Sequence, residues 1–338
     1  MLILGIDTSC DETAAAVLLD GVDVLSSVVA SQMVHSEYGG VVPEYASREH
    51  MRAIVPVVRK ALEDAGRSFE DLDGVAVTNR PGLIGCLLVG AAFAEALAVS
   101  RGVPVVGVDH IEGHVASVRL TEPDVALPMA CLVASGGHTE IILVRTWSEM
   151  RTVARTRDDA AGEAFDKVGK LLGLTYPAGP VIEKLSEGGD PTAFDFPRAM
   201  MERGEPDMSF SGLKTAVRYT LDELGAVPEG RRLSDLLASF QAAVVDALVA
   251  KTMRAAEREN AVSIGLGGGV AANGHLRRRL TEEAERGGFH IVVPPKKLCT
   301  DNGAVIAVVG HRLIEAGEND GAALTAAASR SLLARRGE

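Results

Sequence analysis

The chain has 338 residues, 47% of them hydrophobic, a length that suits two packed domains better than one small core. Its formal net charge of -12 repels nucleic acid on average, so a polynucleotide partner would need a local basic patch or a helper protein. The N-terminus lacks the basic start of a signal peptide, the apolar runs are too interrupted to span a bilayer, and the four cysteines form no Cys-x-x-Cys pair. We therefore expect a cytoplasmic protein without a membrane segment, a disulfide framework or a thiolate zinc site.

The first part of the chain predicts a strand, a polar turn and a returning hairpin. Apolar runs indicate strands at residues 2–6, 13–19 and 24–29. A strand at 74–78, an alanine-rich helix at 87–99 and a strand at 105–108 follow. A strand, helix and strand in this order predict parallel pairing with a right-handed crossover.

The second half repeats this pattern. Strands are expected at 129–134, 140–144 and 152–155, then a long amphipathic helix at 233–257, a strand at 262–266 and a helix at 271–286. Two copies of one unit predict a duplicated, two-lobed α/β fold. We place the first lobe at 1–125 and the second at 126–302, and expect a C-terminal helix within 303–330 to complete the first lobe.

The clearest chemical signal is the pair His110 and His114, directly after the strand at 105–108. Side chains four residues apart lie about 40° apart around a helix axis and can converge on one metal ion. The alternative is two capping or surface imidazoles at a helix start. A zinc protease would need Glu at the second place of His-Glu-x-x-His, but Ile111 stands there, and Glu112 should point away from the metal face.

Three further segments carry polar chemistry. Asp7, Thr8 and Ser9, and Ser135 to Thr139, form matched turns between strands, which could handle phosphate or be ordinary hairpin turns. Glycines 267–269 precede a helix, where they could hold a nucleotide or allow close packing. Asp301 could be a third metal ligand, although a helix N-cap is the commoner role.

Basic residues gather in three places that could meet a polynucleotide, although most such clusters are solvated surface. The clusters are Arg277 with Arg278 and Arg279, Lys296 with Lys297, and Arg151 with Arg155 and Arg157.

An ordered series of motifs closely resembles the bacterial tRNA N6-adenosine threonylcarbamoyltransferase family, formerly called the glycoprotease family. The motifs are Gly-Ile-Asp-Thr-Ser-Cys-Asp-Glu-Thr from residue 5, Tyr-Gly-Gly-Val-Val-Pro-Glu from 38, Val-Asp-His-Ile-Glu-Gly-His from 108, Ala-Ser-Gly-Gly-His-Thr from 134, Ala-Gly-Glu-Ala-Phe-Asp-Lys from 161, Ser-Phe-Ser-Gly-Leu-Lys-Thr-Ala from 209 and Gly-Gly-Gly-Val-Ala-Ala-Asn from 267. The resemblance covers nearly the whole chain and implies the fold shared by actin, Hsp70 and sugar kinases.

The resemblance also implies an activity and its residues. The family transfers a threonylcarbamoyl group from threonylcarbamoyl-adenylate to the N6 amine of the adenosine beside the anticodon in tRNAs that read ANN codons, and AMP leaves. Carried over by motif, the metal ligands are His110, His114 and Asp301, and the substrate residues are Val133, Ala134, Ser135, Gly136, Gly137, Asp166, Gly179, Glu183 and Asn273. Two residues depart from the family pattern: Ala178 replaces a Gly, and Glu183 replaces an Asp.

The same resemblance implies one divalent metal ion per subunit, with iron(II) expected over zinc, whereas two imidazoles and a carboxylate by themselves suit either metal. It implies tRNA, a paralogous inactive subunit and a small ATPase as partners, and no membrane. No general base can be named. Two rival functions remain: a small-molecule kinase of the same fold, and a nucleotide-gated binding or chaperone module.

Overall fold

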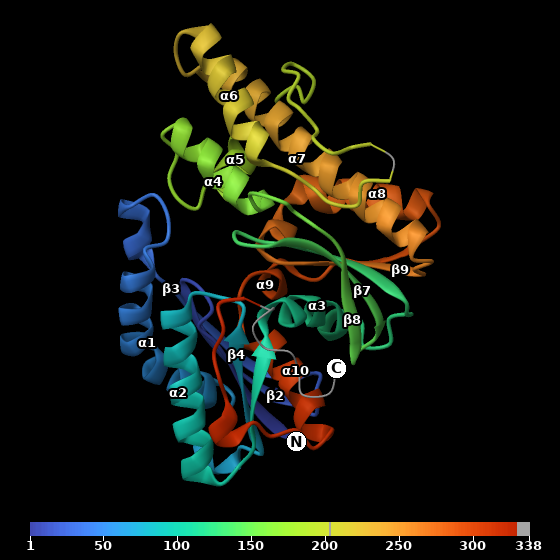
Figure 1. The fold of residues 1–338 in the computed structure, drawn as a ribbon. Helices are drawn as coiled ribbons and strands as arrows, with labels where there is room; N and C mark the ends of the chain where they lie inside the picture. Colours follow the sequence, from blue (N-terminus) through green and yellow to red (C-terminus); the bar gives the residue numbers. More distant parts are fainter. Residues whose placement is uncertain (203, 330–338) are drawn as a thin grey trace. The chain divides into compact units, whose positions relative to one another are not determined.

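The computed structural model describes residues 1–202 and 204–329, which divide into two compact units (Figure 1). The first unit contains Met1–Pro123 and the described residues from Asp301 onward, and the second contains Asp124–Thr300. Each unit is built around its own mixed five-stranded sheet.

The sheet of the first unit has the strand order β3-β2-β1-β4-β5. Its strands are β1 (Leu2–Asp7), β2 (Glu12–Leu19), β3 (Asp23–Ser31), β4 (Gly74–Arg80) and β5 (Val105–Asp109). The first three strands are antiparallel neighbours, whereas β1, β4 and β5 run parallel. The carboxyl ends of these three parallel strands therefore meet at one edge of the sheet, where ligands of α/β folds gather.

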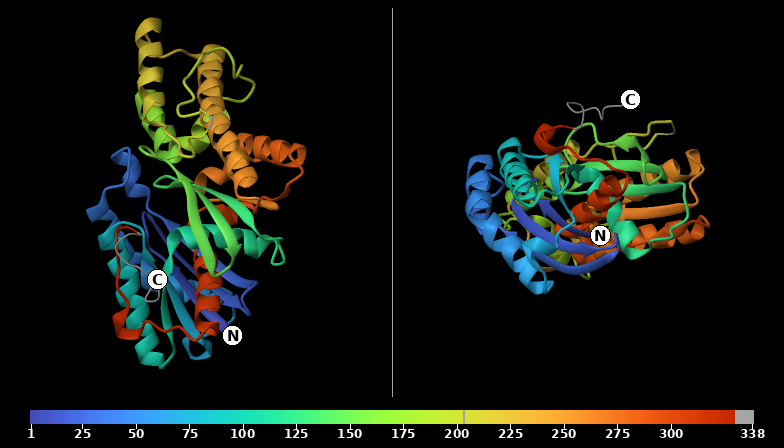
Figure 2. Two further views of the ribbon diagram at one scale, coloured as in Figure 1. Left: turned by 45° about the vertical axis from the view of Figure 1, so that its right-hand side comes forward. Right: turned by 90° about the horizontal axis from the view of Figure 1, so that it is seen from below.

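Helices cover both faces of this sheet. They are α1 (Pro43–Asp64), α2 (Ile84–Arg101), α3 (His110–Thr121) and α10 (Gly303–Glu315). Alternate residues of the strands face opposite sides, so Leu4 packs in one core with α1 and α2, and Ile3 packs in another with α3 and α10. Figure 2 shows α1 and α2 side by side over the same sheet.

The C-terminal helix returns to the first unit because its backbone lies directly on β1. A Cβ atom at Gly5 would lie 2.1 Å from the carbonyl oxygen of Gly303, so only glycine allows this contact. The helix runs from Gly303 to Glu315, within the predicted range of 303–330, and is followed by a short turn at Gly321–Ala323. Residue 330 lies outside the described part of the chain.

The sheet of the second unit has the order β10-β9-β6-β7-β8. Its strands are β6 (Met129–Ala134), β7 (Thr139–Thr146), β8 (Glu149–Arg155), β9 (Ser263–Gly267) and β10 (His290–Val292). Strands β6, β7 and β8 are antiparallel, and β6, β9 and β10 are parallel. In chain order this repeats the first sheet strand for strand, and the predicted duplication is confirmed.

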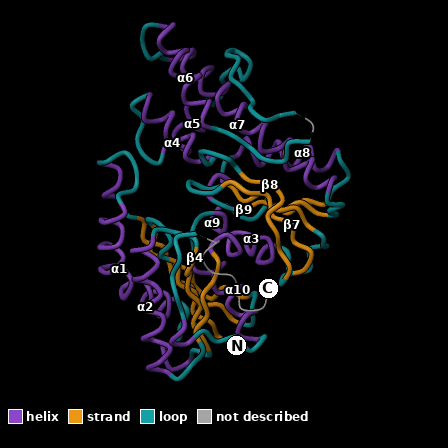
Figure 3. Tube along the Cα trace, viewed as in Figure 1, coloured by secondary structure: helices purple, strands orange, loops and turns teal. Residues whose placement is uncertain are grey.

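The helices of the second unit are α4 (Ala161–Leu171), α5 (Ala178–Leu185), α6 (Ser211–Leu224), α7 (Gly230–Arg258), α8 (Gly274–Arg286) and α9 (Lys296–Cys299) (Figure 3). Most of them contribute to one core, at the centre of which α7 places Leu236, Phe240 and Val244. The predicted helix at 271–286 begins later than expected. Residues Gly269–Ala272 form a 3-10 turn, and Asn273 caps α8 at Gly274.

Two helices, α2 and α7, are long and apolar enough by length and composition to cross a membrane, which the sequence patterns did not indicate. Both are rich in alanine, which raises their mean hydropathy without producing an unbroken apolar run. Within the described residues both pack against the sheets, and α7 is mostly buried in its core. Core helices commonly have this composition.

Candidate functional site

The two histidines lie in the first turns of α3, at the point where β5 ends. Asp109 caps this helix, because its Oδ1 accepts hydrogen bonds from the backbone N–H of Ile111 at 3.0 Å and of Glu112 at 3.3 Å. The cap fixes the helix start and places His110 and His114 on one face. Both side chains are buried, and their ring centroids lie 4.4 Å apart.

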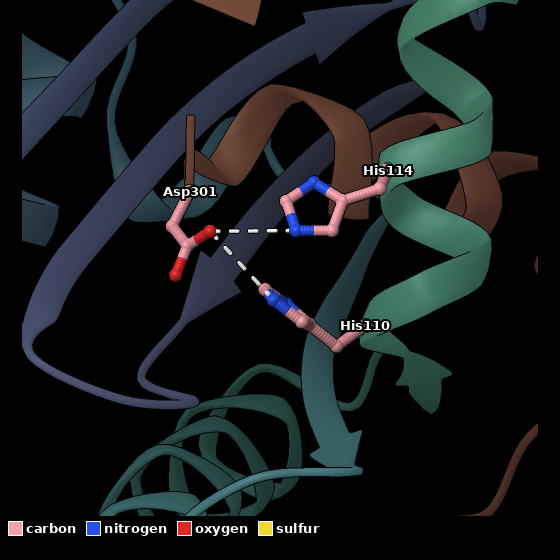
Figure 4. Close-up of side chains that lie close together, drawn as sticks. All are labelled: His110, His114 and Asp301. Carbon is pink, nitrogen blue, oxygen red and sulfur yellow. Dashed lines mark ion pairs between the residues drawn. The ribbon is translucent and has the colours of Figure 1, made fainter. Parts of the chain in front are cut away.

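Asp301 lies against both imidazoles (Figure 4). Its Oδ1 is 3.6 Å from Nε2 of His110 and 3.5 Å from Nε2 of His114. The alternative role as a helix cap belongs instead to Asn302, whose Oδ1 accepts from the backbone N–H groups of Ala304 and Val305. Because its neighbour caps α10, the carboxylate of Asp301 is directed at the histidines.

The three side chains fit a metal ion. One ligand atom from each lies within 4.8 Å of the others. Nitrogen and oxygen ligands lie about 2.0 to 2.2 Å from iron or zinc, so neighbouring ligand atoms are roughly 3 to 3.6 Å apart. The distances from Asp301 to both histidines fall in this range. Two imidazoles and one carboxylate also leave coordination positions open for a substrate.

Asp7 orients His110 and was not predicted to belong to this site. It ends β1, and its Oδ2 lies 3.2 Å from Nδ1 of His110, while its Oδ1 accepts a hydrogen bond from Ser9 N at 2.9 Å. A carboxylate on one imidazole nitrogen fixes the ring and leaves the other nitrogen for a metal. The sequence did hold a clue to this contact. Asp7 ends one predicted strand and His110 follows another, and the carboxyl ends of parallel strands in one sheet lie at the same edge.

Buried charges make this site favourable for a cation. Burial raises the pKa of Asp7, but the nearby His110 more than offsets this effect and holds that pKa below its usual range. Burial, followed by the neighbouring carboxylates of Asp301 and Asp11, raises the pKa of Glu12 to about 9. Burial lowers the pKa of His110, but Asp7 and Asp301 reverse that effect and raise it. A metal ion would neutralise these clustered carboxylates.

Glu112 does not join the site. It accepts a hydrogen bond from the guanidinium of Arg312 on α10, away from the histidine face. The prediction that this carboxylate points away from the metal is confirmed, and the geometry of a His-Glu-x-x-His protease is absent here.

The turn after β6 presents open backbone. Ser135 closes it, since its backbone N–H donates to the carbonyl of His138 at 2.7 Å. Gly136 and Gly137 are exposed, and within the described residues no hydrogen bond from their N–H groups is found. Val133 and Ala134 are buried in β6, so they can offer a ligand backbone groups only. Two free amides at a turn can hold a carbonyl or carboxylate oxygen.

Comparison with known proteins identifies the family of this chain. Residues 23–308 match the sequence profile of a family described as tRNA N6-adenosine threonylcarbamoyltransferase. The chain belongs to this family. It is 54% identical over 334 residues to the enzyme of that name from Sorangium cellulosum, covering 95% of this chain and 94% of the relative. It is 51% identical over 330 residues to the one from Trichlorobacter lovleyi, covering 97% and 96%.

Solved structures of other families share the fold of this tRNA N6-adenosine threonylcarbamoyltransferase family member. Full-length HypF in its phosphate- and nucleotide-bound form matches with a TM-score of 0.61 and 16% identity, over 93% of this chain and 56% of that one. Component A of (R)-2-hydroxyglutaryl-CoA dehydratase from Acidaminococcus fermentans matches with a TM-score of 0.57 and 15% identity, over 94% and 100%. These likenesses confirm the expected actin-like fold.

Three of the other family substrate positions, Asp166, Glu183 and Asn273, accept hydrogen bonds at helix starts of the second unit. Asp166 accepts the N–H of Ala178 at 2.8 Å, at the start of α5. Glu183 accepts the N–H of Gly274 at 2.8 Å, and Asn273 accepts that of Leu276 at 3.0 Å, both at the start of α8. The structure therefore places acceptor side chains at both helix starts. Gly179 lies beside Ala178, with open space where a Cβ atom would be.

The two departures from the family pattern are accommodated locally. The methyl group of Ala178 is buried against Gly169, where a Cβ atom would come within 2.1 Å of it. The longer side chain of Glu183 reaches the first backbone N–H of α8.

Four of the eight residues in the basic clusters are already engaged by carboxylates or backbone carbonyls. Arg151 pairs with Glu259, Arg157 with Glu205 and Asp207, and Arg279 with Glu282 and Glu283. Arg277 donates to the carbonyl oxygens of Ala271 and Pro294. These pairs reduce the positive charge that the clusters could offer to a polynucleotide.

Proposed function

We propose that this tRNA-modifying transferase moves the threonylcarbamoyl group from threonylcarbamoyl-adenylate to the N6 amine of the adenosine beside the anticodon, in tRNAs that read ANN codons. The observation that carries the proposal is the group formed by the buried His110 and His114 with the half-buried Asp301, in a chain of this family. The cytoplasm, where tRNA is modified, is the proposed place of action.

In the proposed step, the adenine amine attacks the carbamoyl carbon of the mixed anhydride. A C–N bond forms, the C–O bond to the phosphate breaks, AMP leaves with the bonding electron pair, and the amine loses a proton. The amine is a poor nucleophile because its lone pair is delocalised into the ring. The enzyme therefore contributes mainly orientation of the two substrates and stabilisation of the leaving phosphate.

His110, His114 and Asp301 would hold one divalent ion, and iron(II) is proposed over zinc because two imidazoles and a carboxylate are typical ligands of non-haem iron(II). When bound, the metal supplies positive charge for phosphate oxygens of the donor. Asp7 and Asp109 keep His110 in place, and the buried position of the histidines limits the access of water.

In the second unit, the free N–H groups of Gly136 and Gly137 would hold a carbonyl or carboxylate of the donor, next to the backbone of Val133, Ala134 and Ser135. Asp166, Gly179, Glu183 and Asn273 would contact the nucleoside part. The backbone N–H groups at these helix starts, those of Ala178, Gly274 and Leu276, already donate hydrogen bonds to protein side chains. Carboxylates there suit ribose hydroxyl groups and disfavour phosphates, which argues against a kinase.

Partners of this enzyme are also part of the proposal. The net charge of -12 and the paired arginines favour a tRNA complex that needs helper proteins, for which we propose a paralogous inactive subunit and a small ATPase. No membrane contact is proposed.

The test supplies threonylcarbamoyl-adenylate and unmodified tRNA to the chain, with and without these two partners, then digests the tRNA and weighs its nucleosides. We expect the modified adenosine only with the partners present. Phosphorylation of a metabolite by ATP, with no modified adenosine under any condition, would indicate the kinase instead. Tight tRNA binding and full modification by the chain alone would refute the need for helpers.

A further inference from the structure

Gln241 is one of several buried polar residues of the helix α7, with Ser239, Lys251 and Thr252. Gln241 is 6% exposed and lies between the buried residues Phe240 and Ala242 in the core of the second unit. A buried amide loses its hydrogen bonds to water and is tolerated only where the protein replaces them. Gln241 replaces them on both sides of its amide.

The amide of Gln241 belongs to a closed ring of hydrogen bonds that joins α5, α7 and α8. Its Nε2 donates to Oγ of Ser186 at 3.1 Å, and Ser186 donates to the carbonyl of Glu183 at 2.8 Å. Its Oε1 accepts from Nδ2 of Asn273 at 2.7 Å. The ring closes where the N–H of Gly274, next to Asn273, donates to the carboxylate of Glu183 at 2.8 Å.

This ring determines what Asn273 can offer a ligand. An asparagine amide has two N–H donors and two acceptor lone pairs. One lone pair takes the N–H of Leu276, and one N–H goes to Gln241, so one donor and one lone pair remain. The helix cap and Gln241 hold the amide from opposite ends, and neither a flip nor a new rotamer preserves both bonds.

We infer that Gln241 is a positioning residue for the substrate site: without touching the ligand, it holds the amide of Asn273 directly and, through Ser186, the backbone of Glu183, and so fixes these two residues relative to each other. The inference rests on the proposed function, in which these two residues contact the nucleoside. A nucleoside has ribose hydroxyl groups that donate to a carboxylate and ring nitrogens that accept from an amide. Fixed spacing between one donor and one acceptor therefore favours this ligand class.

The test makes the substitution Gln241→Met in the full chain. The variant is then assayed together with the partner proteins that tRNA modification requires. Methionine keeps the volume and removes both hydrogen bonds. We expect the KM for threonylcarbamoyl-adenylate and the Kd for AMP to rise roughly tenfold, with kcat changed less than about twofold, because the effect is on binding. Gln241→Glu keeps an oxygen that accepts from Asn273 and should recover most of the affinity.

Ser239→Ala is the matched control on the same helix. Ser239 is also buried, and its Oγ accepts from Phe194 N and donates to backbone carbonyls, away from the ring. The control should lower thermal stability and leave KM unchanged. The double variant Gln241→Met/Asn273→Ala should have a KM less than about twofold above that of the single variant Asn273→Ala, because Gln241 acts through Asn273.

An unchanged KM in Gln241→Met would overturn the inference, as would an equal rise in the Ser239→Ala control. If Gln241→Met does not fold, Gln241→Leu, which also removes both hydrogen bonds, takes its place with Asn273→Ala: additive effects on KM would contradict coupling through Asn273. Failure of the unsubstituted enzyme to bind AMP or to use threonylcarbamoyl-adenylate would instead refute the proposed function itself.

Discussion

The two units use the same five-strand topology for different chemistry. Each has an antiparallel meander joined to two parallel strands, and each places a polar turn after its first strand. In the first unit that turn follows Asp7, a carboxylate held against an imidazole. In the second it contains Gly136 and Gly137, which offer backbone N–H groups and no side chain.

The segments after the last strand of each sheet differ in the same way. Strand β5 leads into α3, a helix of twelve residues with two buried histidines, whereas β10 leads into the four-residue helix α9, which has none. The duplicated sheet thus sets where functional groups can be placed, and the loops and helix starts decide which groups these are. One copy gathers charged ligands, and the other gathers backbone amides and hydrogen-bond acceptors.

The largest effect is expected from substitutions of the metal-binding histidines in the first unit. His110→Ala or His114→Ala should abolish metal retention and lower tRNA modification roughly 100-fold or more, because each removes a ligand that two remaining side chains cannot replace. Metal analysis of the purified variants and nucleoside mass analysis measure both effects. His311→Ala, at a histidine of the same unit outside the metal group, should keep metal and activity. Full metal occupancy in a His114 variant would contradict the assignment.

Two glycine substitutions compare a tightly packed backbone position in the first unit with an unpacked one in the second. Gly5→Ala should lower the free energy of unfolding by about 3 kcal/mol, since its Cβ would lie 2.1 Å from the Gly303 oxygen. Gly137→Ala should change it by less than about 0.5 kcal/mol, because no atom lies within 4 Å of the added carbon. Urea unfolding compares them. Gly137→Ala should nevertheless raise the KM for threonylcarbamoyl-adenylate, and an unchanged KM would count against the proposed role of that turn.

Removing one helix cap in each unit tests whether stability and metal affinity can be changed separately. Asn302→Ala and Asn273→Ala each remove a cap and should each lower the free energy of unfolding by about 1 kcal/mol. Asn302→Ala should also weaken metal affinity roughly tenfold, because Asp301 loses its fixed neighbour, while Asn273→Ala should not. Metal titrations of both variants make the comparison. Equal loss of metal affinity in the two would show that the cap does not act on Asp301.

The smallest expected effect is a pH dependence of the unfolding free energy, caused by the buried His50 of the first unit. Burial lowers the pKa of His50, which outweighs the opposing effects of the Cys10 carbonyl, Asp7 and Asp11, and His35 adds to the lowering. The unfolded chain therefore takes up a proton first as the pH falls below about 6.5, so His50 stabilises the fold fully above that pH and less below it.

The measurement compares the unfolding free energies of the unsubstituted chain and of His50→Gln at about pH 7.5 and about pH 5.5. Glutamine does not titrate, so the difference between the two proteins should narrow at the lower pH. In the folded chain, the ring of His50 contacts Thr13 Oγ1 at 2.8 Å and the carbonyl of Cys10 at 3.0 Å. A difference independent of pH would show that His50 does not titrate differently on unfolding.

The sequence by itself determined the features that depend on neighbouring residues. Strand periodicity predicted β1, β6 and their hairpins, since the side chains of a strand alternate between its faces. The four-residue spacing of His110 and His114 indicated a shared helix face for the same local reason. The helices α1, α4, α5 and α6 were not predicted, because tertiary packing on the sheets and helices stabilises them as much as their own patterns do.

Only the tertiary structure decided which distant residues meet. Asp301 could have been a cap or a ligand, and the choice depended on Asn302 taking the cap. Asp7 reached His110 because parallel strands bring their ends to one edge, and Gln241 reached Asn273 because α7 and α8 pack together. Such contacts arise from the packing of whole elements, so no local pattern around these residues specifies them.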